Sequence, residues 1–369
     1  MQTTPLANSR PILTGEIAQF GGGERSIVAL SRWLYQHNVP NHLVAYNNRC
    51  NLAQYATHPL QIVELNPAPG VRNKVAALRS YFRQYPTPKP LASGYQPTLH
   101  ATLAGVRGLH SLMHDTPTLF SDFAVRTAKS KVRIAVSNRI VGHGLRSGGT
   151  TIVTSEYLRS ECRKDFNVDA KIARMGGLPP ASVPRIRTVT NQLRLFSVSR
   201  IGPNKRVDWM IRGLAALERE ATPLSSRIDW RLDLAGQGPL IPALTHMAQD
   251  LGIGSRIHFH GFVSDAELEL LYVEAHLFLM PAIQGYGIPA IESLQRGIPV
   301  LLHRDSGVSD ILLDTPWATV LTGREDRMNA ALSTAIDGVL EGKHHNVAQP
   351  HLPTEDEWAE RVASLCHWL

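Results

Sequence analysis

Short apolar runs and segments of helical period alternate along most of the chain. An apolar run at residues 11–16 leads through a glycine-rich turn into a helical segment that should end near His37. Strands that alternate with helices are typical of parallel sheets whose faces are covered by helices. The chain is therefore predicted to be an α/β protein. Further strands are expected at residues 42–46, 62–65, 98–103, 109–114, 150–154 and 170–175.

A polar, proline-containing stretch interrupts this alternation in the middle of the chain. Residues 176–192 contain three prolines and two glycines between periodic segments, a composition typical of a hinge between domains. The periodic pattern resumes at Leu193 and continues to about Leu340. We expect an N-terminal domain over residues 1–180, a linker over 181–192, a second domain over 193–350 and a C-terminal helix over 351–369.

The C-terminal segment carries the start signal of a helix. Thr354 and Glu357 have the spacing of a capping box, in which each side chain bonds the backbone amide of the other residue. Four apolar residues should form one side of this helix: Trp358, Val362, Leu365 and Leu369. The helix is expected to cross back to the first domain.

Residues 281–301 combine a glycine-rich turn, a helix start and one carboxylate. They follow a short apolar run that predicts a strand, and Gly285 and Gly287 then provide a permissive backbone that lets a ligand approach main-chain amides. Pro289 is favoured in the first turn of a helix. Glu292 should therefore lie within a turn of a helix N-terminus and face a ligand crevice.

Two cations follow the first predicted strand of the second domain. Arg200 and Lys205 stand between the apolar run at residues 193–198 and the next helical segment, which places them at the mouth of a parallel sheet. Arginine binds phosphate oxygens in a bidentate manner, and lysine adds a point charge. Such cations can stabilise a diphosphate leaving group. The alternative is a pair of solvated loop cations.

In the first domain, candidate ligand contacts follow two predicted strands. Backbone amides of Gly22, Gly23 and Glu24 open the first helix, and helix N-termini bind phosphate or sugar groups. No GK[ST] follows them, so the turn is not a Walker loop. His114 and Asp115 end another predicted strand, where ligands of parallel sheets bind. An ordinary structural role is the alternative for His114.

Composition narrows the class of protein. The chain has 369 residues, 43% apolar and 19% charged, which suits a soluble protein with two domains of ordinary size. We find no signal peptide at its start and no run near the roughly 20 apolar residues of a spanning helix. Cys50, Cys162 and Cys366 lack paired spacing, which argues against a zinc site or disulfides. A cytoplasmic location is expected.

The chain is basic, with a formal net charge of +7 and a pI near 9.4. This favours polyanionic partners, but we expect the charge to be dispersed, and no nucleic-acid-binding module is recognisable. Residues 71–85 place an apolar side opposite Arg72, Arg79 and Arg83, as a helix lying on a membrane does. Peripheral contact with the inner membrane surface is therefore one expectation. The alternative is an ordinary amphipathic helix packed on the N-terminal sheet.

The glycine-rich segment resembles the signature of retaining glycosyltransferases of family 4. In that family, two carboxylates separated by seven residues flank a G-F-G-x-P turn. Here Glu292 is the second carboxylate and Gln284 stands at the position of the first, and the turn itself fits through Gly285, Tyr286 and Gly287. The resemblance is dense over residues 192–310, includes the two cations, and is sparser in the N-terminal half.

The resemblance implies the GT-B fold, an α/β architecture in which two Rossmann-like, doubly wound parallel-sheet domains face a central cleft. It assigns catalytic roles to Arg200, Lys205 and His114, with the histidine touching the transferred sugar. The implied donor-binding residues are Gly22, Gly23, Glu24, Phe262, Val263, Gln284, Gly285, Tyr286, Gly287, Ile288 and Glu292.

Within that set, the resemblance assigns Glu292 to the ribose of the nucleotide and the backbone around Phe262 and Val263 to the base. Gln284 keeps the hydrogen-bonding capacity of the missing glutamate but loses its charge. It is compatible with sugar binding, with reduced activity, with a different donor sugar, or with a chain that binds without turnover.

The implied activity is transfer of a hexose, with retention, from a nucleotide diphosphate sugar to a glycan or lipid-linked acceptor in surface polysaccharide synthesis. Mannose from GDP-mannose is the first choice of donor, and UDP-linked sugars come next. We expect no metal or other cofactor, because two cations supply the charge and no Asp-x-Asp pair is present. Two alternatives stay open: a nucleotide-sugar epimerase or hydrolase of the same fold, and a non-catalytic nucleotide-sugar-binding protein.

Overall fold

The computed structural model describes residues 6–86, 89–116, 127–177, 185–313 and 315–369. The chain divides into two compact units. The N-terminal unit comprises Met1–Gly176 together with Pro353–Leu369, and the C-terminal unit comprises Gly177–Leu352. Part of the expected linker, residues 181–184, lies outside the described residues.

The N-terminal unit is built on a seven-stranded sheet in the order β5-β3-β1-β6-β7-β8-β9, and every pairing in it is parallel. A small parallel pair joins β2 (Glu16–Ile17) to β4 (Asn47–Asn48). The strands of the main sheet are β1 (Arg10–Leu13), β3 (Asn41–Ala45), β5 (Ile62–Glu64), β6 (Leu91–Ser93), β7 (His110–Met113), β8 (Thr151–Val153) and β9 (Lys171–Ile172).

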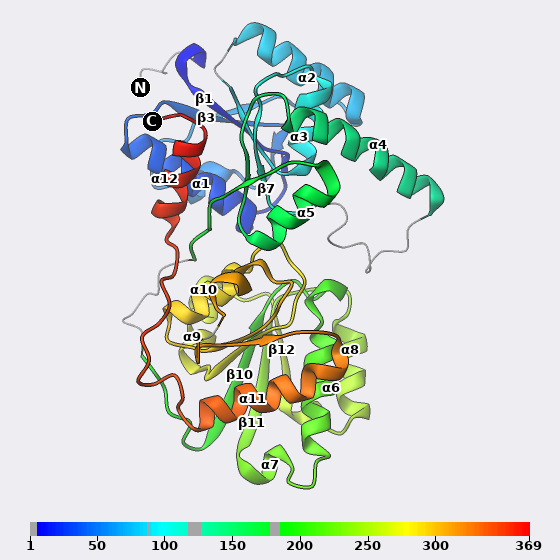
Figure 1. Cartoon of the computed structure of the whole chain (residues 1–369), viewed down its shortest axis with the longest axis vertical. Helices are drawn as coiled ribbons and strands as arrows, with labels where there is room; N and C mark the ends of the chain where they lie inside the picture. Colours follow the sequence, from blue (N-terminus) through cyan, green and yellow to red (C-terminus); the bar gives the residue numbers. More distant parts are fainter. Residues whose placement is uncertain (1–5, 87–88, 117–126, 178–184, 314) are drawn as a thin grey trace. The chain divides into compact units, whose positions relative to one another are not determined.

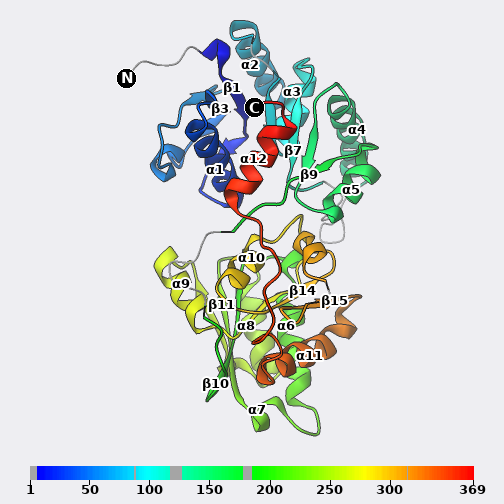
Figure 2. The same ribbon diagram turned by 60° about the vertical axis from the view of Figure 1, so that its left-hand side comes forward.

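Helices cover both faces of this sheet. Right-handed crossovers place helices on opposite faces according to the direction in which the chain moves along the sheet. Accordingly, α1 and α12 pack together on one face, while α2, α3, α4 and α5 follow one another along the other face (Figures 1 and 2). The bounds are α1 (Gly22–Gln36), α2 (Val71–Gln84), α3 (Tyr95–Leu103), α4 (Ala128–Leu145), α5 (Glu156–Phe166) and α12 (Glu355–Leu365).

One strand prediction in this unit is wrong. Residues 98–103 belong to helix α3, and the strand that they were expected to form lies earlier, at β6. Gly94 starts the helix with a φ of +100°, and Pro97 lies in the first turn, where its fixed φ suits a helix. Thr98, Leu99, His100 and Ala101 are all buried. A helix buried on most sides has no polar face, so its short apolar run resembles a strand.

The apolar side of α2 packs into the core. Leu78 and Tyr81 are buried, and Phe82 and Tyr85 pack against the same hydrophobic cluster. The ordinary packed helix is therefore the correct interpretation of this segment. Leu78, Phe82 and Tyr85 are taken up by the protein's own core, so this part of the apolar side is not a membrane-binding surface. Val71, at the start of the helix, is 49% exposed, and contact of the chain with a membrane stays a prediction.

Helix α12 joins the N-terminal unit by polar and apolar contacts. The capping box between Thr354 and Glu357 is present in both directions. Arg25 of α1 pairs with Glu355 at 3.0 Å, and the backbone at Thr354 lies so close to Gly176 that a Cβ there would stand 2.3 Å from it. Leu369 is 67% exposed. The expectation that it lies on the packed side is wrong, because the helix ends at Leu365.

The C-terminal unit contains a six-stranded parallel sheet in the order β12-β11-β10-β13-β14-β15. Its strands are β10 (Gln192–Val198), β11 (Asp229–Ala235), β12 (Ile257–Gly261), β13 (Leu277–Met280), β14 (Val300–His303) and β15 (Ala318–Leu321). Its helices are α6 (Val207–Glu218), α7 (Leu224–Arg227), α8 (Ile241–Asp250), α9 (Asp265–Glu274), α10 (Ile288–Gln295) and α11 (Met328–Leu340).

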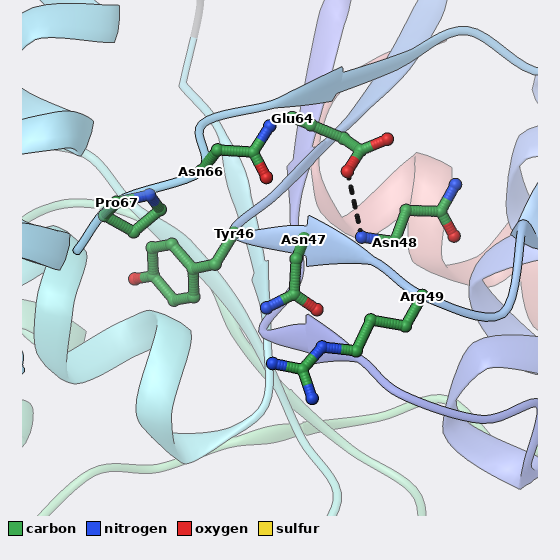
Figure 3. A pocket seen from close by; sticks show the side chains of 7 residues that line it. All are labelled: Tyr46, Asn47, Asn48, Arg49, Glu64, Asn66 and Pro67. Atoms are coloured by element: carbon green, nitrogen blue, oxygen red, sulfur yellow. Dashed lines mark hydrogen bonds between the residues drawn. The ribbon is translucent and has the colours of Figure 1, made fainter. Parts of the chain in front are cut away.

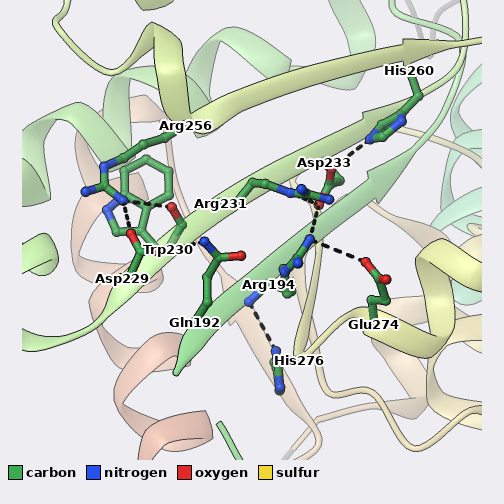
Figure 4. A network of polar contacts seen from close by, with 10 residues as sticks. All are labelled: Gln192, Arg194, Asp229, Trp230, Arg231, Asp233, Arg256, His260, Glu274 and His276. Atoms are coloured by element: carbon green, nitrogen blue, oxygen red, sulfur yellow. Dashed lines mark hydrogen bonds and ion pairs between the residues drawn. The ribbon is translucent and has the colours of Figure 1, made fainter. Parts of the chain in front are cut away.

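A buried carboxylate ties three strands of this sheet together. The side chain of Asp233 on β11 is 5% exposed and lies 2.8 Å from Arg231 Nε and 2.7 Å from His260 Nε2 on β12. Arg194 on β10 approaches it at 3.9 Å and also pairs with Glu274 of α9 at 3.3 Å (Figure 4). A buried charge is tolerated only when it is paired and hydrogen-bonded, so this network has a structural role.

Buried histidines make the stability of the fold depend on pH. His42, His100, His110 and His344 are each at most 2% exposed, and burial lowers the pKa of each from 6.5 to about 4. Protonation then favours the unfolded chain, so stability is full above pH 6.5 and falls as the pH drops toward 4. The expected loss is up to about 3 kcal/mol for each histidine.

Thermal melting followed by circular dichroism across this pH range tests the expectation. His42→Gln removes one of the titrating groups and should flatten the pH dependence of Tm. His246→Gln is the matched control, because the His246 side chain is 75% exposed and its replacement should leave that dependence unchanged. A Tm that stays level from pH 6.5 to 4 would contradict the assignment.

Candidate functional site

The candidate site of the C-terminal unit lies at the carboxyl ends of β10 and β13. These two strands are neighbours, but β10 continues to β11 on one side and β13 to β14 on the other. Loops that leave two adjacent strands in opposite directions open a crevice between them, and ligands of open parallel sheets bind there. The two cations follow β10 and the glycine-rich turn follows β13, so sequence and topology point to the same edge.

The loop after β10 is supported by close backbone contact with the loop after β11. A Cβ on Gly236 would lie 1.9 Å from the carbonyl oxygen of Ser199, and one on Gly238 would lie 2.0 Å from that of Ile201. The amide of Ile201 donates to the carbonyl of Gln237 at 2.8 Å. Only glycine fits these two positions, so the residues of the AGQG segment hold the Arg200 loop in place.

The two predicted cations have different surroundings. Arg200 is exposed, and its side chain has no hydrogen bond or ion pair with any residue within the described ranges. Lys205 is half-buried in a short 3-10 turn, and its Nζ donates to Gln284 Oε1 at 2.6 Å. The structure thus brings Lys205 and Gln284, which are 79 positions apart in the chain, into direct contact.

The amide of Gln284 has its orientation set by neighbours on both sides. Gln284 is 9% exposed, and its Nε2 lies 3.2 Å from Ser306 Oγ and 2.8 Å from Met280 Sδ. Ser306 Oγ donates its own proton to the carbonyl of Tyr286 at 3.0 Å, which leaves its lone pairs to accept from Nε2. The amide oxygen is therefore directed at Lys205.

Ser306 and Met280 were not identified from the sequence. Met280 is the last residue of β13, and Ser306 follows β14, the next strand of the sheet. A usable signal existed, because Met280 ends a predicted strand and Ser306 follows a second apolar run at residues 299–302, and the carboxyl ends of adjacent parallel strands meet at one edge.

The glycine-rich turn fits tightly around Gln284. Gly287 has a φ of +128°, and a Cβ there would stand 2.7 Å from both Gln284 Nε2 and Met280 Cε. Gly285 and Tyr286 are buried, and Ile288 is the first residue of α10. The backbone conformation and the missing side chain are both required at Gly287, so the need for a permissive backbone at this position is confirmed. The approach of a ligand to the main-chain amides of the turn stays a prediction.

Glu292 differs from its expected position. Helix α10 begins at Ile288, so Glu292 is its fifth residue and lies beyond the first turn. The expectation of a first-turn carboxylate is wrong. Glu292 is 7% exposed and accepts a hydrogen bond from Tyr272 Oη at 3.1 Å. Burial, with the Glu292 charge beside it, raises the pKa of Tyr272 well above its usual value, so this phenol keeps its proton and donates.

The remaining donor-site candidate in this unit follows β12. Phe262 is 78% exposed and Val263 is half-buried. The next residue, Ser264, forms a capping box with Glu267 at the start of α9. An exposed aromatic ring at the carboxyl edge of the sheet is available to a planar ligand, and the assignment of this backbone to a base stays a prediction.

The other candidates belong to the N-terminal unit. Helix α1 starts at Gly22, with Gly23 exposed and Glu24 in the first turn. This turn follows β1, which neighbours β6 where the order of the strands reverses. His114 follows β7, and its Nε2 lies 3.0 Å from Ser93 Oγ at the end of β6. Burial lowers the pKa of His114 to about 4, so the ring is neutral near pH 7.

A polar pocket of about 430 Å³ opens at the carboxyl ends of β3 and β5 (Figure 3). The backbone amide of Asn48 donates to Glu64 Oε2 at 3.0 Å, and both residues line the pocket. Amide, guanidinium and carboxylate groups together offer donors and acceptors to a ligand rich in hydroxyls. This pocket was not predicted. It is lined by Tyr46, Asn47, Asn48, Arg49, Glu64, Asn66 and Pro67.

The match to a known family lies within the C-terminal unit. Residues 182–349 match the family described as glycosyl transferases group 1. A mannosyltransferase of Mycolicibacterium smegmatis, GDP-mannose-dependent and acting on phosphatidylinositol monomannoside, is 29% identical over 47% of this chain and 46% of its own length. O-antigen chain mannosyltransferase B of Escherichia coli is 23% identical over 53% of this chain and 55% of its own. The chain thus spans about half the length of these relatives.

The likeness of the structure covers nearly the whole chain. Sucrose-phosphate synthase from Thermosynechococcus elongatus has a TM-score of 0.69 at 14% identity, covering 97% of this chain and 95% of that one. Anabaena HepE in complex with UDP-glucose also has a TM-score of 0.69 at 14% identity, covering 96% and 95%. At such identities the likeness shows the fold. The chain therefore has the GT-B fold with two parallel-sheet domains, and over residues 182–349 it is similar to the glycosyl transferases group 1 family.

Proposed function

We propose that this protein is a retaining glycosyltransferase that moves a hexose from a nucleotide diphosphate sugar to a glycan or lipid-linked acceptor. The observation that carries the proposal is the contact between Lys205 and Gln284 at the point where the strand order reverses, beside an Arg200 loop held by glycines. The mannosyltransferases among the similar sequences support mannose from GDP-mannose as the first donor to test.

The proposed chemistry needs positive charge more than it needs a base. The diphosphate gains negative charge as the glycosidic bond breaks, and fixed cations such as Arg200 and Lys205 stabilise it. In a retaining transfer the departing phosphate can take the proton of the acceptor hydroxyl on the same face of the sugar. Gln284 then has no proton to move; it holds Lys205 and presents a neutral amide beside the sugar.

Acceptor binding is proposed for the N-terminal unit. The polar pocket lined by Asn47, Arg49 and Glu64 supplies the kind of donors and acceptors that bind carbohydrate hydroxyls. His114 Nε2 contacts Ser93 Oγ, so the neutral ring offers its other nitrogen, Nδ1, to a ligand at the carboxyl edge of the same sheet. Both features support a hydroxyl-rich acceptor or sugar over an apolar one.

A non-catalytic nucleotide-sugar-binding protein is the competing function. It is favoured by one observation, namely that an uncharged, buried glutamine engages the lysine. The resemblance to family 4 implies a carboxylate at that position. A thermal-shift screen against GDP-, UDP-, ADP- and dTDP-sugars identifies the donor, because a ligand that binds only the folded state raises Tm. The protein is then incubated with the donor that it binds and with candidate glycan acceptors. Chromatography of this mixture distinguishes the two functions. Release of nucleotide diphosphate with a new glycoside supports the transferase, and binding without consumption of the donor supports the binding protein.

Transfer is expected to persist in excess EDTA. Arg200 and Lys205 already occupy the electrostatic role that a magnesium ion has in other phosphate-transfer sites. The rate of nucleotide diphosphate release should therefore be the same with EDTA as with added magnesium. The assay needs a metal-dependent transferase as its positive control for chelation. Activity that returns only on addition of magnesium or manganese would contradict the prediction.

A further inference from the structure

The positive charge of the chain is concentrated in one segment. Residues 65–155 contain twelve lysine and arginine residues and two aspartates, a formal charge of +10, whereas the whole chain carries +7. The remainder of the chain is therefore slightly acidic. The expectation that the basic charge is dispersed is wrong.

Three helices of this segment, α2, α3 and α4, form a layer on one face of the N-terminal sheet, with α3 packed between α2 and α4 (Figures 1 and 2). On α2, Arg72, Arg79 and Arg83 are exposed, and Arg79 NH2 donates to the carbonyl of Leu103 at the end of α3 at 3.0 Å. The apolar side of α2 is buried, so its outward side is polar and basic.

A cationic pocket lies where α2 and α3 end. It has a volume of about 500 Å³. Its charged lining residues are Arg79, Arg83, Lys89 and Arg107, and its apolar lining includes Phe82. Lys89 also donates to the carbonyl of Gly148 at 2.9 Å. Cations grouped beside an apolar wall suit an anionic head group.

Helix α4 has an outward side of a different kind. None of its first thirteen residues, 128–140, is buried, and its buried residues begin at Val141. Val132 is 65% exposed and Val136 52% exposed, and both stand at helical spacing with Arg139 on one side of the helix. Lys129, Lys131 and Arg133 are exposed beside them. Apolar side chains thus project among cations, with no core to cover them.

We propose that the outward side of α2–α4 is a docking surface for an anionic lipid bilayer. Anionic lipids attract clustered lysine and arginine, and exposed valines among those cations can enter the boundary between head groups and acyl chains. A second copy of this surface carries the same sign of charge and is repelled. A nucleic acid satisfies the cations but offers the valines no apolar partner.

Docking of this surface on a bilayer does not require a membrane-spanning helix. Among the residues that the structure describes, no helix is long and apolar enough to cross a membrane. Docking by charge and shallow insertion needs no such helix. It would bring the N-terminal unit to the place where a lipid-linked acceptor is held, but the docking itself does not rest on the proposed transfer.

Vesicle flotation of the full chain tests the surface. The protein is mixed with vesicles of phosphatidylcholine alone, or of equal parts of phosphatidylcholine and phosphatidylglycerol. It should float with the second kind, and raised salt should weaken the binding. Lys129→Gln, Lys131→Gln, Arg133→Gln and Arg139→Gln combined should lower the partition coefficient by roughly 10³-fold, since each cation near an anionic surface contributes about 1 kcal/mol. Val132→Ser with Val136→Ser should lower it by about 10-fold without changing the charge.

The matched control removes four exposed cations from the C-terminal unit: Arg219→Gln, Arg324→Gln, Arg327→Gln and Lys343→Gln. It should float like the parent protein. Melting curves confirm that each variant is folded. Equal loss in the control and α4 variants, equal binding to both kinds of vesicle, or no flotation at all would overturn the proposal. So would retention on a polynucleotide column without vesicle binding. None of these results bears on transfer to a soluble acceptor, which is measured separately.

Discussion

Replacement of Lys205 with alanine is expected to lower kcat/KM for sugar transfer by roughly 10²-fold or more. Lys205 is half-buried and held by Gln284 at 2.6 Å, so its charge is fixed in one place. A fixed charge stabilises the developing diphosphate without first having to reorganise, and alanine removes it. Initial rates of nucleotide diphosphate release over a range of donor concentrations measure the change.

Arg200→Ala should have an effect of the same order, because the exposed guanidinium is the second proposed phosphate ligand. Arg200→Lys is the informative companion, since it keeps the charge but loses bidentate geometry and should fall between wild type and Arg200→Ala. Arg219→Ala, at the end of α6, is the control for removal of an exposed cation. Wild-type kinetics in both Lys205→Ala and Arg200→Ala would remove these residues from the site.

Gln284→Glu, which introduces the carboxylate that the resemblance to family 4 implies at this position, is expected to reduce transfer. The amide nitrogen of Gln284 faces Ser306 Oγ and Met280 Sδ, and Ser306 already donates its proton to Tyr286. A second carboxylate oxygen at that position would face acceptors, and a buried polar atom without a donor costs about 1–3 kcal/mol. We expect use of the intact nucleotide sugar to fall about 10-fold, with the affinity for nucleotide diphosphate nearly unchanged.

Substitutions of Gln284 also distinguish the transferase from the non-catalytic binding protein. Gln284→Ala removes the partner of Lys205 and should weaken use of the nucleotide sugar while the nucleotide diphosphate still binds. Calorimetry with the nucleotide diphosphate and rate measurements with the intact donor report the two effects independently. Gain of activity in Gln284→Glu, from an inactive parent, would favour the binding protein instead. No effect from either substitution would place residue 284 outside the sugar site.

Much of the architecture was predictable from the sequence, because it follows from local rules. Alternating apolar runs and helical segments predicted an α/β chain with parallel sheets, and both sheets are parallel. The capping box at Thr354 was predictable from the sequence, because Thr354 and Glu357 accept hydrogen bonds from each other's backbone amides within one turn. The exception shows the limit of such rules. Helix α3 is buried on most sides, so it has no polar face for a periodic pattern to reveal.

Part of the candidate site was also predictable. Arg200, Lys205 and the turn around Gly287 are adjacent to strand ends, and the carboxyl edge of a parallel sheet is where ligands bind. The resemblance to family 4 placed Gln284 and Glu292 in the same region. Their roles in catalysis and donor binding stay predictions.

The sequence by itself determined most of the strands and helices, helix α3 being the exception, and which polar residues follow the strands. Only the tertiary structure decided which of these residues meet. Lys205 contacts Gln284, and Gln284 contacts Ser306, because β10, β13 and β14 are neighbours in the sheet. Local patterns of hydrophobicity specify a strand but not its neighbours, since the order of strands is settled by packing across the whole unit. For the same reason, the direction of the Gln284 amide and the burial of Glu292 against Tyr272 could be known only from the folded chain.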